Sequence, residues 1–258
     1  MSTIKELYDY RQMIFSLVKK DLRGRYKGSV LGFMWTFINP LLQLIIYTLV
    51  FSNFLKAGIE RYYLHLFVAL IPWIFFSSSI TVGAASIISQ KDLVKKIYFP
   101  RMVIPISYVT SCFVNMLLCF IVIFAVIIVT GAGINFLAVL TLPIIMIVEY
   151  IFALGMALLT SAITVYFRDM EHILGIVSMA WMYLTPVVYP KSMIPGKYQK
   201  IFNLNPMTPI IDCYRTVLYD KQIPDLSILL IAVALGVFFL IFGALVFNKL
   251  QRHFAEEL

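Results

Sequence analysis

The sequence has little charge and few residues of the kinds that build catalytic or metal sites. Only 13% of its 258 residues are Asp, Glu, Lys or Arg, about half the share of roughly 25% in soluble domains. Its three cysteines do not form a disulfide framework, and its three histidines lie far apart, so we expect no metal site. It contains no paired carboxylates, no Ser/His/Asp arrangement and no Gly-x-x-x-x-Gly-Lys-Ser/Thr phosphate loop. These absences argue against an enzyme. A pump built on this chain must draw its energy from another subunit or from an ion gradient.

Apolar residues, in contrast, make up 61% of the chain, and the mean hydropathy is +0.91. A helix crosses ~30 Å of hydrocarbon with about 20 mostly apolar residues. Six segments qualify, at 32–54, 64–89, 103–130, 137–166, 173–189 and 227–248. The fifth is the shortest, and Pro186 lies near its end. The sequence therefore predicts an all-α integral membrane protein with six transmembrane helices.

The distribution of Lys and Arg predicts how the chain crosses the membrane. With the N-terminus inside, the inside segments carry twice as many Lys and Arg residues as the outside segments, as the positive-inside rule requires. This bias explains most of the net charge of +8, so we expect membrane lipids as partners and no nucleic acid. Both termini are then cytoplasmic. A single domain, 1–258, comprises a surface helix and basic linker (1–31), the six-helix membrane part (32–248) and a cytoplasmic tail (249–258).

Residues 3–22 have the spacing of an amphipathic helix. Apolar side chains recur every three or four residues, with Lys and Arg between them. We expect a helix that lies on the membrane surface, either as a plain anchor or as an interface that also contacts a partner protein. Arg23, Arg25 and Lys27 follow it. They serve as a positive-inside anchor or hold the phosphates of a lipid-linked substrate at the inner leaflet.

Two segments between the spans are unusual for plain loops. The inside loop 90–100 is basic, and Leu93, Ile97 and Phe99 are apolar without a span to explain them. A surface on which another protein docks explains them better than a plain loop. The outside segment 190–226 carries five prolines around an apolar run that is too short to cross a membrane. It indicates re-entrant helices buried in protein, with an ordinary outer cap as the alternative.

Aromatic residues form 15% of the chain. Those of the first and fifth spans are Trp35, Phe37, Tyr47, Phe51, Trp181, Tyr183 and Tyr189. Trp and Tyr gather at membrane interfaces in any case. The more specific hypothesis is a lining on which the C–H faces of sugars stack, so that a polysaccharide can slide through.

Glu149 is the one acid deep within a predicted span. The 15 Leu, Ile, Val and Phe residues of 137–166 favour insertion by roughly 4.5 to 9 kcal/mol. One charge near the middle of a span costs about 2.5 to 3.5 kcal/mol. The span therefore tolerates Glu149, and a role facing a cavity or a partner helix stays open beside a passive one.

Several strings together resemble the permease subunit of ABC exporters for lipid-linked polysaccharides. They are DLRGRYKGSVLGFMW at 21–35, NPLL at 39–42, FRDM at 167–170, WMYLTPVVY at 181–189 and NP at 205–206. That family includes exporters of O-antigen, capsule and wall teichoic acid, and the likeness covers essentially the whole chain. It implies a homodimer in the bacterial cytoplasmic membrane. Two separate ATPase subunits bind the ATP and Mg²⁺, and this chain holds no cofactor.

The resemblance also implies roles for particular residues. The loop at 90–100 becomes the coupling helix seated on the ATPase, and spans one and five line the path. The residues of this loop that contact the ATPase are Lys91, Leu93, Lys95, Lys96, Ile97 and Tyr98. A second contact with the ATPase lies at Arg168 and Asp169. The alternatives are an ABC permease for drugs or small lipids, a secondary carrier and a membrane-embedded glycan enzyme.

Overall fold

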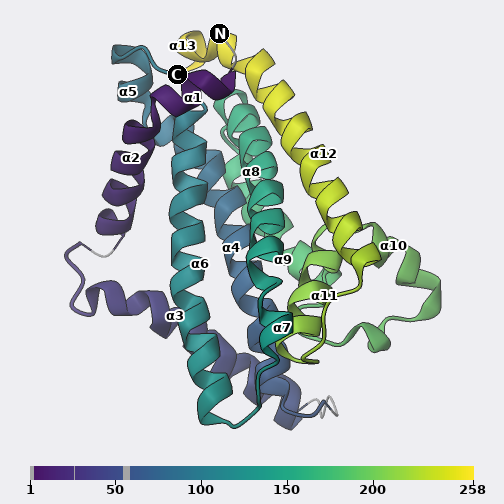
Figure 1. The fold of residues 1–258 in the computed structure, drawn as a ribbon. Coiled ribbons are helices and arrows are strands. Elements are labelled where there is room, and N and C mark those ends of the chain that lie inside the picture. Colours follow the sequence, from purple (N-terminus) through teal and green to yellow (C-terminus); the bar gives the residue numbers. More distant parts are fainter. Residues whose placement is uncertain (1–2, 26, 55–58) are drawn as a thin grey trace.

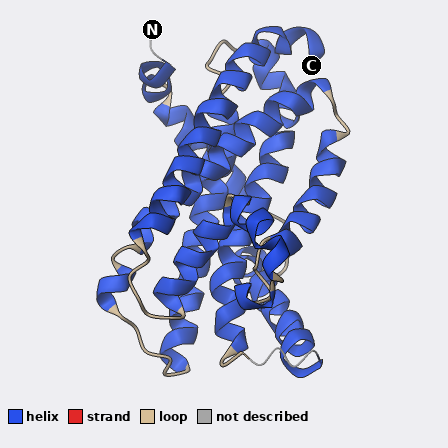
Figure 2. Cartoon of the chain, turned by 90° about the vertical axis from the view of Figure 1, so that its right-hand side faces the viewer, coloured by secondary structure: helices blue, strands red, loops and turns tan. Residues whose placement is uncertain are grey.

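The computed structural model describes residues 3–25, 27–54 and 59–258. Within these ranges every regular element is a helix, and no strand forms (Figure 2). Five helices are long and apolar enough to cross a membrane. They are α3 with its flanking turns (Gly32–Phe51), α4 (Tyr62–Ser89), α6 (Val103–Val129), α7 with α8 (Phe136–Tyr166) and α12 with the turn that follows it (Leu226–His253). They match five of the six predicted spans closely, and the prediction of an all-α membrane protein is confirmed.

The predicted fifth span is a shorter helix. α9 (Met170–Leu184) has 15 residues, about 22 Å at 1.5 Å per residue, which is less than the hydrocarbon thickness. It ends because Thr185 precedes Pro186 and is extended, with φ −106° and ψ 134°; a residue before proline avoids the helical region. The segment 173–189 is therefore not one continuous helix.

The core is built around α4. This helix is apolar around its whole circumference, and most of its side chains are buried, as expected of a helix surrounded by protein. α6 and α8 pack on it, and α12 packs on α8 (Figure 1). α8 and α12 meet at glycines: a Cβ on Gly243 would lie 2.1 Å from the carbonyl oxygen of Gly155. Small residues allow such close backbone contact between membrane helices.

Both chain ends lie at the same end of the molecule, with the short helices α1 (Thr3–Asp9), α5 (Lys91–Lys96) and α13 (Phe254–Glu257) (Figure 1). The predicted surface helix consists of two pieces, because the chain breaks at Tyr10 between α1 and α2 (Arg11–Gly24). α2 packs along α6 with one face and exposes the other.

The segment between α9 and α12 folds at the other end of the molecule. It contains two 3₁₀ turns (Lys191–Met193 and Gly196–Tyr198), α10 (Gln199–Leu204) and α11 (Met207–Leu218). α11 packs against α4, α8 and α12, and ten of its 12 residues are buried. α11 is therefore packed as part of the helical bundle.

Candidate functional site

The seven aromatic residues predicted as a lining do not form one surface. Trp35 and Phe37 lie at the α2 end of α3, where the Trp35 Nε1 donates to Ser29 Oγ at 3.1 Å. Phe37 meets Phe33 edge to face at 5.5 Å. Trp35 and Phe37 are both half-buried.

A second group lies where α3 and α9 end. Phe51 stacks on Tyr62 at 6.1 Å, and the Tyr62 hydroxyl donates to the Val188 carbonyl at 2.6 Å. Tyr47 lies near Tyr62 and Tyr183. The Tyr189 hydroxyl donates to the Tyr183 carbonyl. Tyr183 is 51% exposed. Tyr47, Phe51 and Tyr189 are half-buried, so this group presents one exposed ring, that of Tyr183.

Trp181, in contrast, belongs to the core. Its ring meets Phe76 edge to face at 5.1 Å, and its Nε1 donates to Asn205 Oδ1 at 2.8 Å. Asn205 also donates to the Leu184 carbonyl and to Thr185 Oγ1. Trp181 thus ties α9 to the start of α11, and only its edge lines an open groove beside α10.

α9 leaves most of its apolar surface uncovered. Leu174, Ser178 and Met182, spaced four residues apart, form its buried stripe, and Ser178 Oγ lies 2.6 Å from Ser77 Oγ on α4. Six other apolar side chains of α9 are 42–67% exposed; they are Ile173, Ile176, Val177, Met179, Tyr183 and Leu184. A face of this kind requires lipid, another copy of the chain or an apolar substrate to cover it.

The three predicted phosphate-binding residues separate in the structure. Arg23 and Lys27 are exposed, whereas Arg25 turns inward. The Arg25 Nε donates to Asp21 Oδ2 at 2.8 Å, and Nη2 lies 3.2 Å from Cys112 Sγ on α6. Asp21 also accepts a hydrogen bond from Ser111. Burial alone lowers the pKa of Arg25, but its contacts with Cys112 and Asp21 outweigh burial and raise that pKa.

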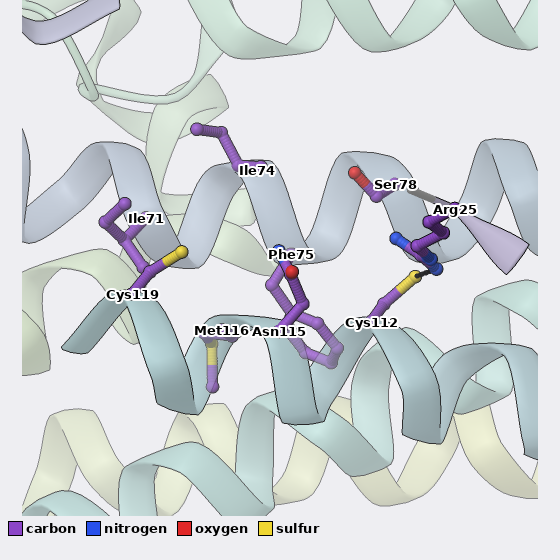
Figure 3. A pocket seen from close by; sticks show the side chains of 9 residues that line it. All are labelled: Arg25, Ile71, Ile74, Phe75, Ser78, Cys112, Asn115, Met116 and Cys119. Carbon is purple, nitrogen blue, oxygen red and sulfur yellow. Dashed lines mark hydrogen bonds between the residues drawn. The ribbon is translucent and has the colours of Figure 1, made fainter. Parts of the chain in front are cut away.

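Arg25 also closes an internal pocket between α4 and α6, shown in Figure 3. The pocket is small, about 20 Å³. Its other lining residues are Ile71, Ile74, Phe75, Ser78, Cys112, Asn115, Met116 and Cys119. Arg25 therefore anchors α2 to the bundle, and Arg23 and Lys27 remain as the accessible cations of the set.

The loop at 90–100 has a buried and an exposed side. Val94 and Phe99 are buried with Met102 and Val103, and Leu93 packs against the same cluster. Packing inside the molecule therefore accounts for the apolar character of Leu93 and Phe99. Ile97 is 56% exposed and Tyr98 is 87% exposed. Their side chains remain for an outside partner, together with the exposed Lys91, Lys95 and Lys96.

Arg168 and Asp169 form an exposed turn between α8 and α9. Just before them, Tyr166 donates to the Leu250 carbonyl at 2.8 Å and packs against Phe254. The turn therefore lies at the same end of the molecule as α5, where a partner that covers one can reach the other.

Glu149 faces α11. It is fully buried, and its Oε2 accepts a hydrogen bond of 2.7 Å from the Tyr214 hydroxyl. Its Oε1 has no hydrogen-bond partner among the described residues. The next residue of α11, Arg215, is also buried and donates to the Val187 carbonyl at 2.6 Å and to the His65 carbonyl at 3.5 Å. The sequence pointed to Glu149 but not to these partners, because only the fold brings α11 beside α8.

With this geometry in place, comparison with known proteins defines the class. Residues 12–219 match the family model described as ABC-2 type transporter. The chain belongs to this family of membrane permeases.

Curated relatives cover nearly the whole chain. An O-antigen export system permease protein RfbA from Myxococcus xanthus is 34% identical over 257 residues, which are 99% of this chain and 98% of that protein. A protein of the same name from Klebsiella pneumoniae is 35% identical over 246 residues, 95% of each chain. A further Klebsiella pneumoniae relative of that name is 33% identical over the same length.

Proposed function

We propose that this chain is the permease subunit of an ATP-driven exporter that moves a lipid-linked polysaccharide of the O-antigen type across the bacterial cytoplasmic membrane. The observation that carries the proposal is the identity of 33–35%, over 95% or more of the chain, to three permeases named for O-antigen export. The five long apolar helices and the absence of a phosphate loop from the sequence agree with a transport subunit that does not itself hydrolyse ATP.

The arrangement proposed in the membrane has six crossings. α9 is the fifth crossing and is completed by the turns at residues 185–189, and α10 with α11 re-enters the membrane from the outer side. Both chain ends then lie in the cytoplasm. The exposed face of α9 is covered in a homodimer, and the aromatic rings near the ends of α3 and α9 line the path between the two copies. Tyr47, Phe51, Tyr183 and Tyr189 are the residues of that lining.

ATP and Mg²⁺ bind to a separate ATPase subunit, present in two copies. It docks on Ile97 and Tyr98 and on the lysines of α5, with a second contact at Arg168 and Asp169. On the same side of the membrane, Arg23 and Lys27 attract the phosphate of the lipid carrier.

Surface glycan in a strain that lacks this gene tests the proposal. Restoring the wild-type chain together with an active ATPase subunit restores glycan at the cell surface, whereas an ATPase subunit without hydrolytic activity does not. Glycan display that persists without the chain, in a strain with no second exporter, would sink the proposal. Export that depends on the proton gradient while ATP is present would instead indicate a secondary carrier.

The lining is tested by Tyr47→Ala and Tyr183→Ala, because these rings are accessible, whereas Trp181 is needed for packing. We expect each variant to slow the export of long glycan chains more than the export of short ones. Slowing that does not depend on chain length would favour a permease for drugs or small lipids, which needs no sliding surface.

A further inference from the structure

Residues 248–258 fold back on the bundle and do not trail away from it. Phe254 is fully buried. Its ring meets Phe247 at 5.5 Å and Tyr166 at 6.3 Å, both edge to face. A large aromatic ring buried in this way contributes strongly to packing, and cutting it back to Ala leaves a cavity. The sequence predicted only a cytoplasmic tail here.

The same ring reaches the segment that follows α5. Arg101 lies over Phe254 at 5.8 Å and donates to the Gln251 carbonyl. Phe254 also belongs to the apolar cluster that holds Val94 and Phe99. Residues 248–254 and the loop around residues 97–101 are therefore fixed to each other through one buried side chain and one guanidinium.

Between these two segments lies an open groove of about 550 Å³. The loop supplies Ile97, Tyr98 and Arg101, the end of α12 and the following turn supply Asn248 and Arg252, and α1 supplies Glu6. The rim thus combines two exposed apolar side chains with the exposed guanidinium of Arg252. Arg101 is half-buried and already donates to the Gln251 carbonyl, and Glu6 adds one carboxylate to the lining. Lys95 and Lys96 stand exposed beside the groove and make the surrounding charge positive. A protein segment that presents an apolar side chain flanked by carboxylates complements this surface.

We propose that this groove receives an acidic and apolar segment of the ATPase subunit, that Arg252 forms its second wall, and that Phe254 positions the coupling loop against that wall. The inference rests on the proposed function and extends it, because the docking surface then includes residues that lie about 150 positions after the loop. The groove is continuous with Ile97 and Tyr98, so one partner segment can contact both walls.

Charge reversal at the second wall tests the surface. Permease in nanodiscs of fixed lipid composition is titrated with its ATPase subunit, and the Kd is measured by biolayer interferometry. Arg252→Glu weakens binding by about tenfold. The matched control is Lys249→Glu, because Lys249 is exposed one turn away and does not line the groove; it changes the Kd by less than about twofold. Equal effects of the two variants, or no effect of either, overturn the inference.

Ile97→Asp separates this inference from the proposed function. If Ile97→Asp weakens binding and Arg252→Glu does not, the loop docks the ATPase alone and only the second wall is wrong. If neither weakens binding, the docking site of the proposed function is wrong as well.

The positioning role of Phe254 is tested by the ATP hydrolysed per glycan exported. Phe254→Ala raises this ratio severalfold, and Phe254→Leu restores most of the coupling because it refills the cluster. Phe238→Ala is the control, since Phe238 is 59% exposed on α12 and also loses a ring. A Phe254→Ala protein that melts earlier but keeps the wild-type ratio and Kd contradicts positioning. If that variant does not fold, the Arg252→Glu titration decides alone.

Discussion

The end of the molecule that holds α5 and α13 keeps most of its lysines and arginines at the surface above a buried apolar cluster. The end that holds α11, in contrast, buries a carboxylate, a phenol and a guanidinium. Buried polar groups must find partners or they destabilise the fold. Glu149, Tyr214 and Arg215 therefore fix where α11 sits. Surface charges carry no such requirement and are free to bind a partner. The same residue types thus determine structure at one end and recognition at the other.

The largest expected effect is the loss of the buried guanidinium. Arg215→Met keeps much of the side-chain length but leaves the Val187 and His65 carbonyls without their donor. We expect a loss of about 3 kcal/mol in the free energy of unfolding, since hydrogen bonds to charged groups contribute roughly 1.5 to 3 kcal/mol each. Thermal unfolding in detergent measures it. Lys197→Met is the control because Lys197 is exposed; a similar loss there would remove the contrast between buried and exposed cations.

A smaller effect follows from the Glu149–Tyr214 pair. Tyr214→Phe removes the donor to Glu149 Oε2 and leaves both carboxyl oxygens without a partner among the described residues. Hydrogen bonds between membrane helices contribute about 0.6 kcal/mol on average, so we expect a loss of roughly 1 kcal/mol, with the burial of the unpaired group added. Glu149→Gln keeps an acceptor for Tyr214 and should lose less. The reverse order, measured by the same unfolding experiment, would show that the pair does not hold α11.

The sequence predicted the features of the fold and site that depend on neighbouring residues, and missed those that depend on residues far apart in the chain. The long spans follow from local hydropathy, so their bounds agree within a few residues at Val103–Val129 and Leu226–Leu250. The short α9 was harder, because Pro186 ends the helix inside an apolar run. Glu149 was visible as a charge in a span, but Tyr214, 65 positions later, was not. The four-residue spacing of Asp21 and Arg25 is that of a helical ion pair, but it could not show that Arg25 also meets Cys112, 87 positions later.

Arg25 and Arg23 bring the same comparison into a single helix turn. Arg25→Ala removes the contact with Cys112 that fastens the end of α2 to α6, together with the ion pair to Asp21 of α2 itself. We expect about 1 kcal/mol of destabilisation. Faster hydrogen exchange of the α2 amides would report the loosening. Arg23 is exposed, so Arg23→Ala should leave the hydrogen exchange of the α2 amides unchanged. Equal protection of α2 in the two variants would show that Arg25 is no anchor.

The smallest effect on stability belongs to the lysines of α5, and it completes the comparison. Lys95 and Lys96 are exposed and form no ion pair among the described residues, so their joint replacement by Ala should change the free energy of unfolding by less than about 0.5 kcal/mol. Their charge should still matter for the partner, because charges at the rim of an interface raise the rate of association. We expect slower, salt-dependent binding of the ATPase subunit with an unchanged melting temperature. A variant that melts early but binds at the normal rate would mean that these lysines serve the fold, and that the α5 end does not differ from the α11 end as the structure indicates.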